Sequence, residues 1–319
     1  MNESVHLPRT AERLMRIRPF HVMELLRRAR ELEAAGRRIV HMEIGEPDFP
    51  TAEPVVDAGI EALRAGRTTY LPAAGLPELR EAIAAHYRQR YSVDVDPERI
   101  LVTPGASGAL VVAMALTVDP GGEVLLPDPG YPCNRNFVEL VNGVPRSVAV
   151  GPDTDYQLTA AYAAPVCNDR TAAILIGSPS NPTGTLAEAG ELERLAALAA
   201  ERELALVVDE IYHGLHYDVE PATALRHAPG AMVVNSFSKY FGMTGWRLGW
   251  LVVPEGMQAD AEKLIGNLFI NASTPAQYAA LACFTDEVQA ICEERRQAFR
   301  ERRDFLLPAL RELGFRIPG

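Results

Sequence analysis

Lysine is almost missing from this chain of 319 residues. Of its 31 basic residues only two, Lys239 and Lys263, are lysines, and all the others are arginines. Because arginine serves wherever the chain needs only a positive charge, a lysine indicates chemistry that a guanidinium cannot perform. A primary amine can lose its proton and form an imine with an aldehyde. Lys239 follows the apolar run 231–234 and stands among small and aromatic residues, so we predict a Schiff-base lysine at this position.

Other absences exclude whole classes of protein. No stretch approaches about eighteen consecutive apolar residues, so no membrane-spanning helix is expected, and the start of the chain, residues 1–6, lacks the basic-then-apolar order of a signal peptide. The four cysteines have no metal-type spacing, and we expect reduced thiols in packing roles and no metal site. A net charge of −11 disfavours nucleic acid or an anionic membrane as a partner. We therefore expect a cytoplasmic protein.

Two common nucleotide-binding signatures are also missing. The pattern G-x-G-x-x-G is absent, and no acidic residue stands where it would hold a ribose. The pattern G-x-x-x-x-G-K-[ST] is absent as well, because Ser238 precedes Lys239 and Glu262 precedes Lys263. The acidic residue Asp209, which ends an apolar run, is therefore not expected to hold the magnesium ion of a nucleotide hydrolase.

The order of apolar runs and amphipathic stretches predicts an α/β fold. Runs at 172–176 and 204–208 are unbroken, which is typical of parallel strands buried on both faces. Alternation of strands and helices through residues 100–253 predicts a mostly parallel sheet wrapped by helices, with ligand loops at the carboxyl ends of the strands. A short extended run is predicted at 39–44, further strands at 100–102, 124–126, 147–150 and 250–253, and helices at 19–35, 53–65, 77–91, 110–116, 186–202, 257–268, 275–284 and 286–313.

The residues around Lys239 describe a site for a phosphorylated aldehyde. Ser236 and Ser238 flank the amine with hydroxyl groups, and Arg247 follows eight residues after the lysine with the planar fork that suits a phosphate. The motif resembles that of the pyridoxal phosphate (PLP) dependent aminotransferases of fold type I, classes I and II, which include aspartate aminotransferase, and the resemblance covers nearly all of the chain. It implies a fold type I large domain with a mostly parallel mixed sheet flanked by helices. It also implies a transaminase that moves an amino group between an L-amino acid and a 2-oxo acid, with PLP held by Lys239.

A glycine-rich turn at 103–109 lies between a predicted strand and a predicted helix. This geometry points free backbone N–H groups and a helix dipole at an anion. We therefore expect Gly105, Ala106 and Ser107 to bind the same phosphate that Ser238 and Arg247 approach.

Three further motifs each follow a predicted strand, and the resemblance gives each a role. Tyr131, in D-P-x-Y, is implied to stack on the pyridine ring, although a tyrosine in such a turn also serves as a lid on the core. Asn181, in S-P-x-N-P-T-G, is implied to donate its amide to the phenolic oxygen of the cofactor and to face the substrate. In D-E-x-Y, Asp209 is implied to pair with the ring nitrogen and Tyr212 to bind the phenolic oxygen. Lys239, Asp209 and Tyr212 are thus the candidate catalytic residues.

Two motifs in the first quarter of the chain complete the resemblance. Gly45, in G-x-P-D-F, is implied to meet the substrate carboxylate, although the loop alone also fits a turn before a helix. Tyr70, in Y-x-x-x-x-G-x-x-x-L-R, is implied to cross a dimer interface to the cofactor phosphate of the partner subunit. On the residues alone Tyr70 fits a half-buried aromatic residue. The resemblance therefore predicts a homodimer with shared active sites.

The predicted domain organisation has three parts. Residues 1–45 form an N-terminal helix and arm, 46–285 the large PLP-binding domain, and 286–319 the start of a small C-terminal domain. The family usually places an arginine for the substrate carboxylate in a longer C-terminal domain, and no residue here matches it. We therefore expect an incomplete small domain, and the sequence supports cofactor binding more strongly than full turnover.

Two alternatives to an aminotransferase remain from the sequence. A lyase, synthase or decarboxylase on the same fold would use the same cofactor residues. A cofactor-binding regulatory protein would need a DNA-reading segment, and no basic helix-turn-helix stretch precedes Pro19.

Overall fold

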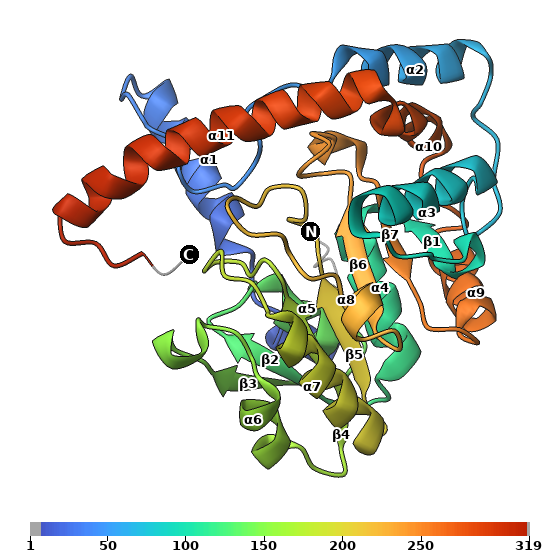
Figure 1. The fold of residues 1–319 in the computed structure, drawn as a ribbon, viewed down its shortest axis with the longest axis vertical. Coiled ribbons are helices and arrows are strands. Elements are labelled where there is room, and N and C mark those ends of the chain that lie inside the picture. The colour runs from blue at the N-terminus through green and yellow to red at the C-terminus, as the bar shows by residue number, and fades with distance from the viewer. Residues whose placement is uncertain (1–7, 318–319) are drawn as a thin grey trace, which may run out of the picture.

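A seven-stranded sheet forms the centre of residues 8–317, the part of the chain that the computed structural model describes (Figure 1). The strand order is β1-β7-β6-β5-β4-β2-β3, and only β7 runs antiparallel to its neighbours. The sheet is therefore mixed and mostly parallel, as predicted. The strands are β1 (Ile100–Thr103), β2 (Glu123–Asp128), β3 (Val144–Ala149), β4 (Thr171–Gly177), β5 (Ala205–Asp209), β6 (Met232–Ser236) and β7 (Gly249–Val252).

Helices flank this sheet on both sides (Figure 1). The α-helices are α1 (His21–Ala34), α2 (Glu53–Arg64), α3 (Pro77–Tyr91), α4 (Gly105–Thr117), α5 (Cys133–Leu140), α6 (Ala160–Ala163), α7 (Ala189–Glu201), α8 (Ala224–His227), α9 (Gln258–Leu268), α10 (Thr274–Leu281) and α11 (Asp286–Glu312). Short 3-10 turns lie at η1 (Glu12–Met15), η2 (Pro97–Arg99), η3 (Pro152–Thr154), η4 (Ala164–Val166), η5 (Thr244–Trp246) and η6 (Ala282–Phe284).

The core has two layers, one on each face of the sheet. Successive side chains of a strand point to opposite faces, and in β1 Ile100 and Val102 join one buried cluster while Leu101 joins the other. Apolar side chains of α3 and α7 cover the first face, and those of α4 and α9 cover the second. Burial on both faces explains why the sequence of the central strands is apolar without alternation.

The extended run predicted at 39–44 does not join the sheet. Residues 39–44 form no strand and pair with no other segment of the sheet. Val40 and Met42 are 75% and 76% exposed, so this apolar run has no layer to pack against and gains nothing from a strand geometry. The helix predicted at 110–116 begins earlier, at Gly105, because the glycine-rich turn itself forms the first turn of α4.

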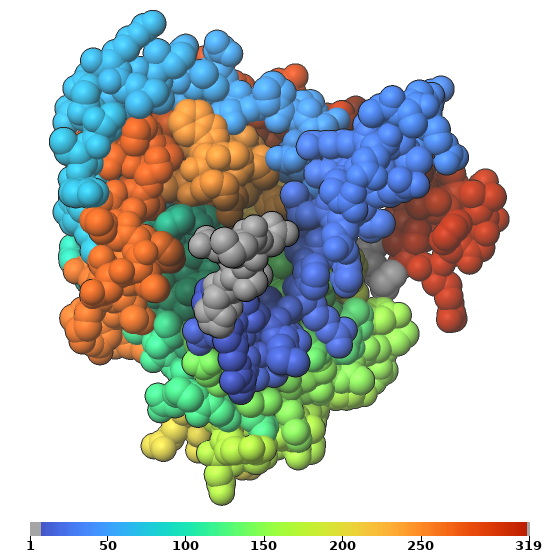
Figure 2. Space-filling view, turned by 180° about the vertical axis from the view of Figure 1, so that it is seen from behind, coloured from blue at the N-terminus to red at the C-terminus, as the bar shows by residue number. Residues whose placement is uncertain are grey.

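The two ends of the described chain lie on the outside of this core. On the face shown in Figure 2, the blue N-terminal segment lies against the green surface of α5, where Arg16 Nε donates to Glu139 Oε2 at 2.6 Å. At the other end, the 27-residue helix α11 buries only Val288 and Cys292. Residues 1–6, on which the expectation of no signal peptide rests, lie outside the described residues. Among residues 8–317, none of the helices combines the length and the apolar character needed to cross a membrane.

Candidate active site

One edge of the sheet collects almost all of the predicted site residues. Asp209 ends β5 and Ser236 ends β6, while Tyr131 and Asn181 follow β2 and β4 within four residues. Because these strands are parallel, their carboxyl ends share this edge. A pocket of about 920 Å³ opens there. Among the predicted residues, those that line it are Gly45, Ala106, Ser107, Tyr131, Asn181, Asp209, Tyr212 and Lys239.

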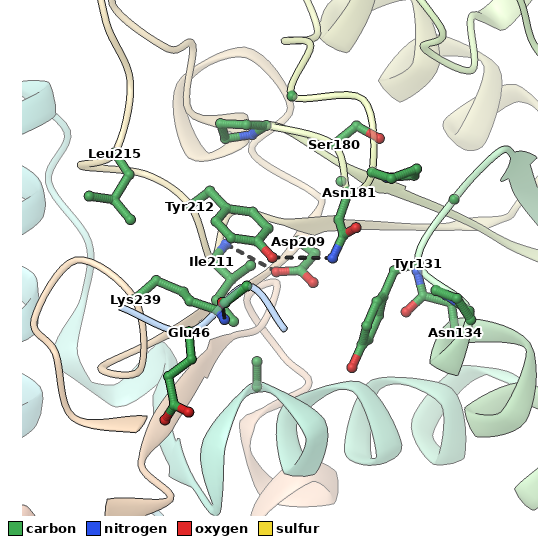
Figure 3. A pocket seen from close by; sticks show the side chains of 18 of the residues that line it. Glu46, Tyr131, Asn134, Ser180, Asn181, Asp209, Ile211, Tyr212, Leu215 and Lys239 are labelled. Atoms are coloured by element: carbon green, nitrogen blue, oxygen red, sulfur yellow. Dashed lines mark hydrogen bonds between the residues drawn. The ribbon is translucent and has the colours of Figure 1, made fainter. Parts of the chain in front are cut away.

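Lys239 reaches into this pocket from the loop after β6 (Figure 3). Its Nζ atom donates a hydrogen bond to the Gly45 carbonyl at 2.6 Å and lies 5.7 Å from the centre of the Tyr212 ring. Burial lowers the pKa of Lys239, the Glu46 carboxylate opposes that shift, and the Arg247 guanidinium adds to it. The amine is therefore easier to deprotonate than that of an exposed lysine.

Asp209 forms the floor of the pocket behind Tyr212 in Figure 3. Burial raises the pKa of Asp209 to about 6, while the hydrogen bond from the Ile211 N–H and the charge of Lys239 limit the rise. That N–H donates to Asp209 Oδ1 at 3.0 Å. Among residues 8–317 the second oxygen of this buried carboxyl accepts no hydrogen bond, so it is suited to hold a cationic N–H group, which would restore its ionised form.

Asn181 and Tyr212 form a hydrogen-bonded pair of polar groups in the lining of the pocket. The Asn181 amide nitrogen donates to the Tyr212 hydroxyl at 3.2 Å, which leaves the hydroxyl proton of Tyr212 free to be donated. Burial raises the pKa of Tyr212, and so does the nearby charge of Asp209, so this hydroxyl stays protonated. Tyr131 projects into the same space from the other side (Figure 3), where its flat ring can cover a planar ligand.

The start of α4 and the Arg247 guanidinium lie in direct contact beside this pocket. Gly105 has a left-handed φ of +71°, and a Cβ atom placed on it would lie 2.7 Å from Arg247 Nη2. Gly249 packs equally closely against the start of α4, since a Cβ atom on it would lie 2.7 Å from the Gly105 carbonyl carbon and 2.8 Å from the Ala106 nitrogen. No side chain caps the N-terminus of α4. Free N–H groups and a guanidinium therefore converge in a space that only glycine leaves open, which suits a phosphate.

Ser236 and Ser238 lie buried next to this contact. The Ser236 hydroxyl donates to the Leu248 carbonyl at 3.0 Å, which leaves it to accept from the Ser238 hydroxyl at 2.9 Å. The bond to Leu248 ties the lysine loop to the residue that follows Arg247. The two serines thus join Lys239 and Arg247 into one rigid unit.

The predicted residue Tyr70 lies on the outer surface of its own chain. The Tyr70 side chain is 78% exposed and does not line the pocket. Its neighbours are held firmly, since the Leu71 N–H donates to Asn271 Oδ1 at 3.2 Å and the Thr274 hydroxyl donates to the Thr69 carbonyl at 2.8 Å. Tyr70 is therefore presented outward from an ordered turn.

The pocket also contains residues that the sequence did not indicate. Glu46 follows Gly45 in the G-x-P-D-F loop, so its place in the motif was a usable signal. Arg303 and Leu307 come from α11, and nothing in their local sequence marks them. Arg303 lies over the Tyr217 ring with its guanidinium carbon 4.8 Å from the ring centre. Among the described residues no group of three or more His, Cys, Asp and Glu side chains could hold a metal ion.

Comparisons with known proteins show which family the chain belongs to. Residues 37–319 match the family described as aminotransferase class I and II. The chain is 37% identical over 298 residues to valine–pyruvate aminotransferase of Mycobacterium tuberculosis, covering 93% of this chain and 76% of that protein. It is 35% identical over 310 residues to (5-formylfuran-3-yl)methyl phosphate transaminase of Methanocaldococcus jannaschii, covering 96% and 80%. The structure of aspartate aminotransferase from Thermus thermophilus with maleate superposes with a TM-score of 0.92 at 35% identity, covering 97% and 82%.

The chain belongs to the class I and II aminotransferases. It has the aspartate aminotransferase-like fold, and it is a PLP-dependent transaminase that acts on amino acids and 2-oxo acids. This confirms the prediction of an aminotransferase over a lyase or a regulatory protein. The residues present fit the cofactor, since the donors at Gly105 and Arg247 suit its phosphate and the buried Asp209 carboxyl suits its ring nitrogen.

Proposed function

We propose that Lys239, Asp209 and Tyr212 perform the transamination, with Lys239 holding the cofactor and moving the proton. The observation that carries this is the convergence of all three in one pocket. When bound, PLP supplies an aldehyde that condenses with amines and a ring that accepts electrons. The lowered pKa of Lys239, caused first by burial, favours the neutral amine that takes a proton from the α-carbon of the substrate.

Asp209 would hold a proton at the ring nitrogen, since its carboxyl lies on the pocket floor with one oxygen unpaired by the backbone. Tyr212 and Asn181 would both donate to the phenolic oxygen, and Tyr131 would stack on the ring. The Gly45 backbone, together with Asn181, would meet the substrate carboxylate. The proposed phosphate ligands are Gly105, Ala106, Ser107, Ser236, Ser238, Arg247 and, from a partner subunit, Tyr70.

A single half-reaction tests this assignment. The enzyme loaded with PLP is mixed with one amino acid and no 2-oxo acid, and the visible absorption band and the oxo acid formed are measured. We expect one equivalent of oxo acid per site from wild-type enzyme and none from Lys239→Ala. Turnover by Lys239→Ala at the wild-type rate would overturn the role given to this residue.

We also propose that the preferred amino acids have apolar side chains. Apolar residues from distant segments, Val22, Leu215 and Leu307, line the pocket. Arg303, a cation in the same lining, is already paired with Asp218 at 2.9 Å, so it is not free for an acidic side chain. One relative of this chain is a valine–pyruvate aminotransferase, which makes valine the first amino acid to test. We expect the half-reaction with valine to be at least about 10-fold faster than with aspartate, and the reverse order would contradict the proposal.

A homodimer with shared active sites is proposed from the position of Tyr70. In Figure 2, the cyan residues around 70 and the orange residues around 270 form one continuous surface. The exposed side chains on it include Tyr70, Leu268 and Ile270, the latter two 50% and 49% exposed. A second copy of the chain would cover these apolar groups and receive Tyr70 in its own pocket.

Mixing two impaired variants tests this arrangement. A heterodimer of Lys239→Ala and Tyr70→Ala has one site with both residues intact, so in a refolded equal mixture these sites are expected to supply about a quarter of wild-type activity. Mixtures that form dimers but are no more active than the two variants measured separately would contradict a shared site.

Two coarser proposals complete the assignment. The division into residues 1–45, 46–285 and 286–319 is supported by α11, which buries only two of its 27 residues. A cytoplasmic location is supported by the four cysteines, all of which are free thiols, as is usual in a reducing compartment. Limited proteolysis near residue 285 and cell fractionation test these two proposals.

A further inference from the structure

Tyr240 follows Lys239 directly but faces away from the pocket. Its side chain is buried, with 6% of its surface exposed. The ring lies against the backbone of Gly214, where a Cβ atom would lie 2.5 Å from two ring carbons and φ is +98°. Gly214 stands two residues after Tyr212. One buried ring thus contacts both segments that carry the proposed catalytic residues.

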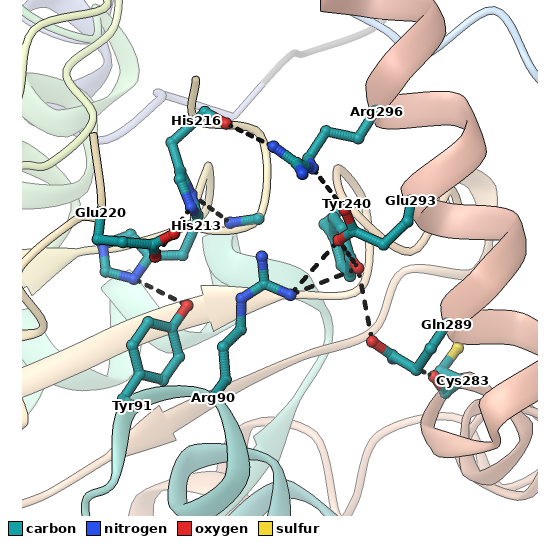
Figure 4. Close-up of polar contacts among 11 residues, drawn as sticks. Arg90, Tyr91, His213, His216, Glu220, Tyr240, Cys283, Gln289, Glu293 and Arg296 are labelled. Atoms are coloured by element: carbon teal, nitrogen blue, oxygen red, sulfur yellow. Dashed lines mark hydrogen bonds and ion pairs between the residues drawn. The ribbon is translucent and has the colours of Figure 1, made fainter. Parts of the chain in front are cut away.

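The Tyr240 hydroxyl joins these segments to two helices (Figure 4). It donates to Glu293 Oε1 of α11 at 2.6 Å and accepts from Arg90 Nη1 of α3 at 3.4 Å. The Arg90 guanidinium carbon lies 5.1 Å from the centre of the Tyr240 ring, and Arg90 pairs with Glu293 at 3.6 Å. Burial and the bond to Glu293 both raise the pKa of Tyr240, so its hydroxyl remains a donor throughout the physiological range.

Glu293 has a second link to the active-site loop. Burial alone would raise the pKa of Glu293, but the hydrogen bonds from Tyr240 and Arg296 outweigh it and the pKa is lowered. Arg296 Nε donates to Glu293 Oε2 at 2.6 Å, and its Nη1 donates to the His216 carbonyl at 3.1 Å. The helix that bears Glu293 also supplies Arg303 to the pocket lining. Helix α11 is therefore bonded to the Lys239 segment through Tyr240 and to the loop after β5 through the His216 carbonyl. The same helix also lines the pocket.

Stability alone does not explain the polar cluster of Tyr240, Arg90, Glu293 and Arg296. One of its buried nitrogen atoms, Arg90 Nε, has no hydrogen-bond partner among the described residues. Unpaired buried polar atoms cost stability, and an apolar interior of the same shape would avoid that cost. A cluster with an unpaired buried nitrogen is better suited to fix the positions of the segments that it joins than to stabilise the fold.

We propose that Tyr240 is a positioning residue for the transamination, because the bond between its hydroxyl and Glu293 fixes the backbone from which Lys239 reaches the substrate. The proposal rests on the proposed role of Lys239. A shift of the Lys239 amine by a fraction of an ångström changes its alignment with the α-carbon and its distances to Asp209 and Arg247, while substrate binding, which uses other groups, stays nearly unchanged.

The variant Tyr240→Phe tests the proposal in the holoenzyme. It keeps the ring with its packing against Gly214 and the Arg90 guanidinium, and removes only the hydroxyl with its hydrogen bonds to Glu293 and Arg90. We expect kcat to fall by about 10-fold or more, with KM for the amino acid within about twofold of wild type. We also expect the pH midpoint of the visible absorption band of the bound cofactor to move, because the surroundings of the Lys239 amine change.

A matched control exists elsewhere in the chain. Tyr278 also carries an arginine over its ring, with the Arg67 guanidinium carbon at 5.1 Å and a hydrogen bond to its hydroxyl at 3.5 Å, and it does not line the pocket. Tyr278→Phe is expected to leave kcat and the pH midpoint unchanged. Lys239→Ala, which should abolish the band, tests the proposed function separately.

A second variant decides the matter if Tyr240→Phe does not fold. Glu293→Gln keeps an acceptor oxygen for Tyr240 but loses the charge, and we expect kcat to fall by about threefold at unchanged KM, less than in Tyr240→Phe. Wild-type kcat and an unmoved pH midpoint in the folded variants, with only the melting temperature lowered, would show that the cluster is structural and would overturn the proposal.

Discussion

Replacing Gly105 by alanine is expected to weaken PLP binding far more than it weakens the fold. The residue has a φ of +71°, and a left-handed conformation costs a non-glycine residue about 1–2 kcal/mol. The new Cβ atom would lie 2.7 Å from Arg247 Nη2, so the guanidinium has to move away from the start of α4. Loss of one hydrogen bond between charged groups costs about 1.5–3 kcal/mol, which corresponds to about a 10- to 100-fold rise in the Kd for PLP.

The chain offers a control that separates strain from contact. Gly121 has a φ of +87° and nothing within 4 Å of its Cβ position. Gly121→Ala should therefore lose similar stability and keep the wild-type Kd. Both variants are titrated with PLP as apoenzymes, by equilibrium dialysis, and their melting temperatures are measured. A Gly105→Ala variant that is destabilised like Gly121→Ala but binds PLP as tightly as wild type would refute the phosphate site.

Two further predictions concern the stability of the apoenzyme. Burial raises the pKa of Asp209 from 3.8 to about 6; the folded state thus binds more protons than the unfolded state between these values, and stability falls as the pH rises through them. Relative to Asp209→Asn, wild-type apoenzyme should lose about 2–3 kcal/mol of unfolding free energy between pH 4 and pH 7. Urea titrations of both proteins at both pH values measure this loss. A stability difference between the two proteins that does not change with pH would be evidence against it. Tyr87→Phe removes the acceptor of the buried Trp250 indole N–H, now at 3.1 Å, and should cost about 1–3 kcal/mol with kcat unchanged; a fall in kcat without a shift of the urea midpoint would contradict this assignment.

The sequence predicted those parts of the site that depend on the order of strands. Tyr131, Asn181 and Asp209 are far apart in the chain, but each lies at or just after the carboxyl end of one of the parallel strands. Parallel strands bring their carboxyl ends to one edge whatever the details of packing. The glycine-rich turn at 103–109 was also visible in the sequence. Gly105 is required there because any side chain would collide with Arg247.

Other contacts could not be predicted from the sequence, because they depend on the path of a whole helix. Arg303 reaches the pocket and Glu293 reaches Tyr240 only because α11 packs against the active-site loops. Tyr240 and Glu293 are 53 residues apart in the chain. An arginine on a charged helix has no local pattern that distinguishes it from its neighbours. The extended run at 39–44 stays outside the sheet for a related reason, since apolar residues form a strand only where a neighbouring strand is available to pair with them.

The most direct test of the central claim uses the scarcity of lysine. The holoenzyme is reduced with borohydride and digested, and the peptides are analysed by mass spectrometry. Only two lysines can carry the reduced cofactor, and Lys263 is an exposed residue paired with Asp260. We predict one equivalent of reduced cofactor on Lys239 and none on Lys263, with no labelling after Lys239→Ala. Labelling of Lys263, or no stable labelling of either lysine, would contradict the account.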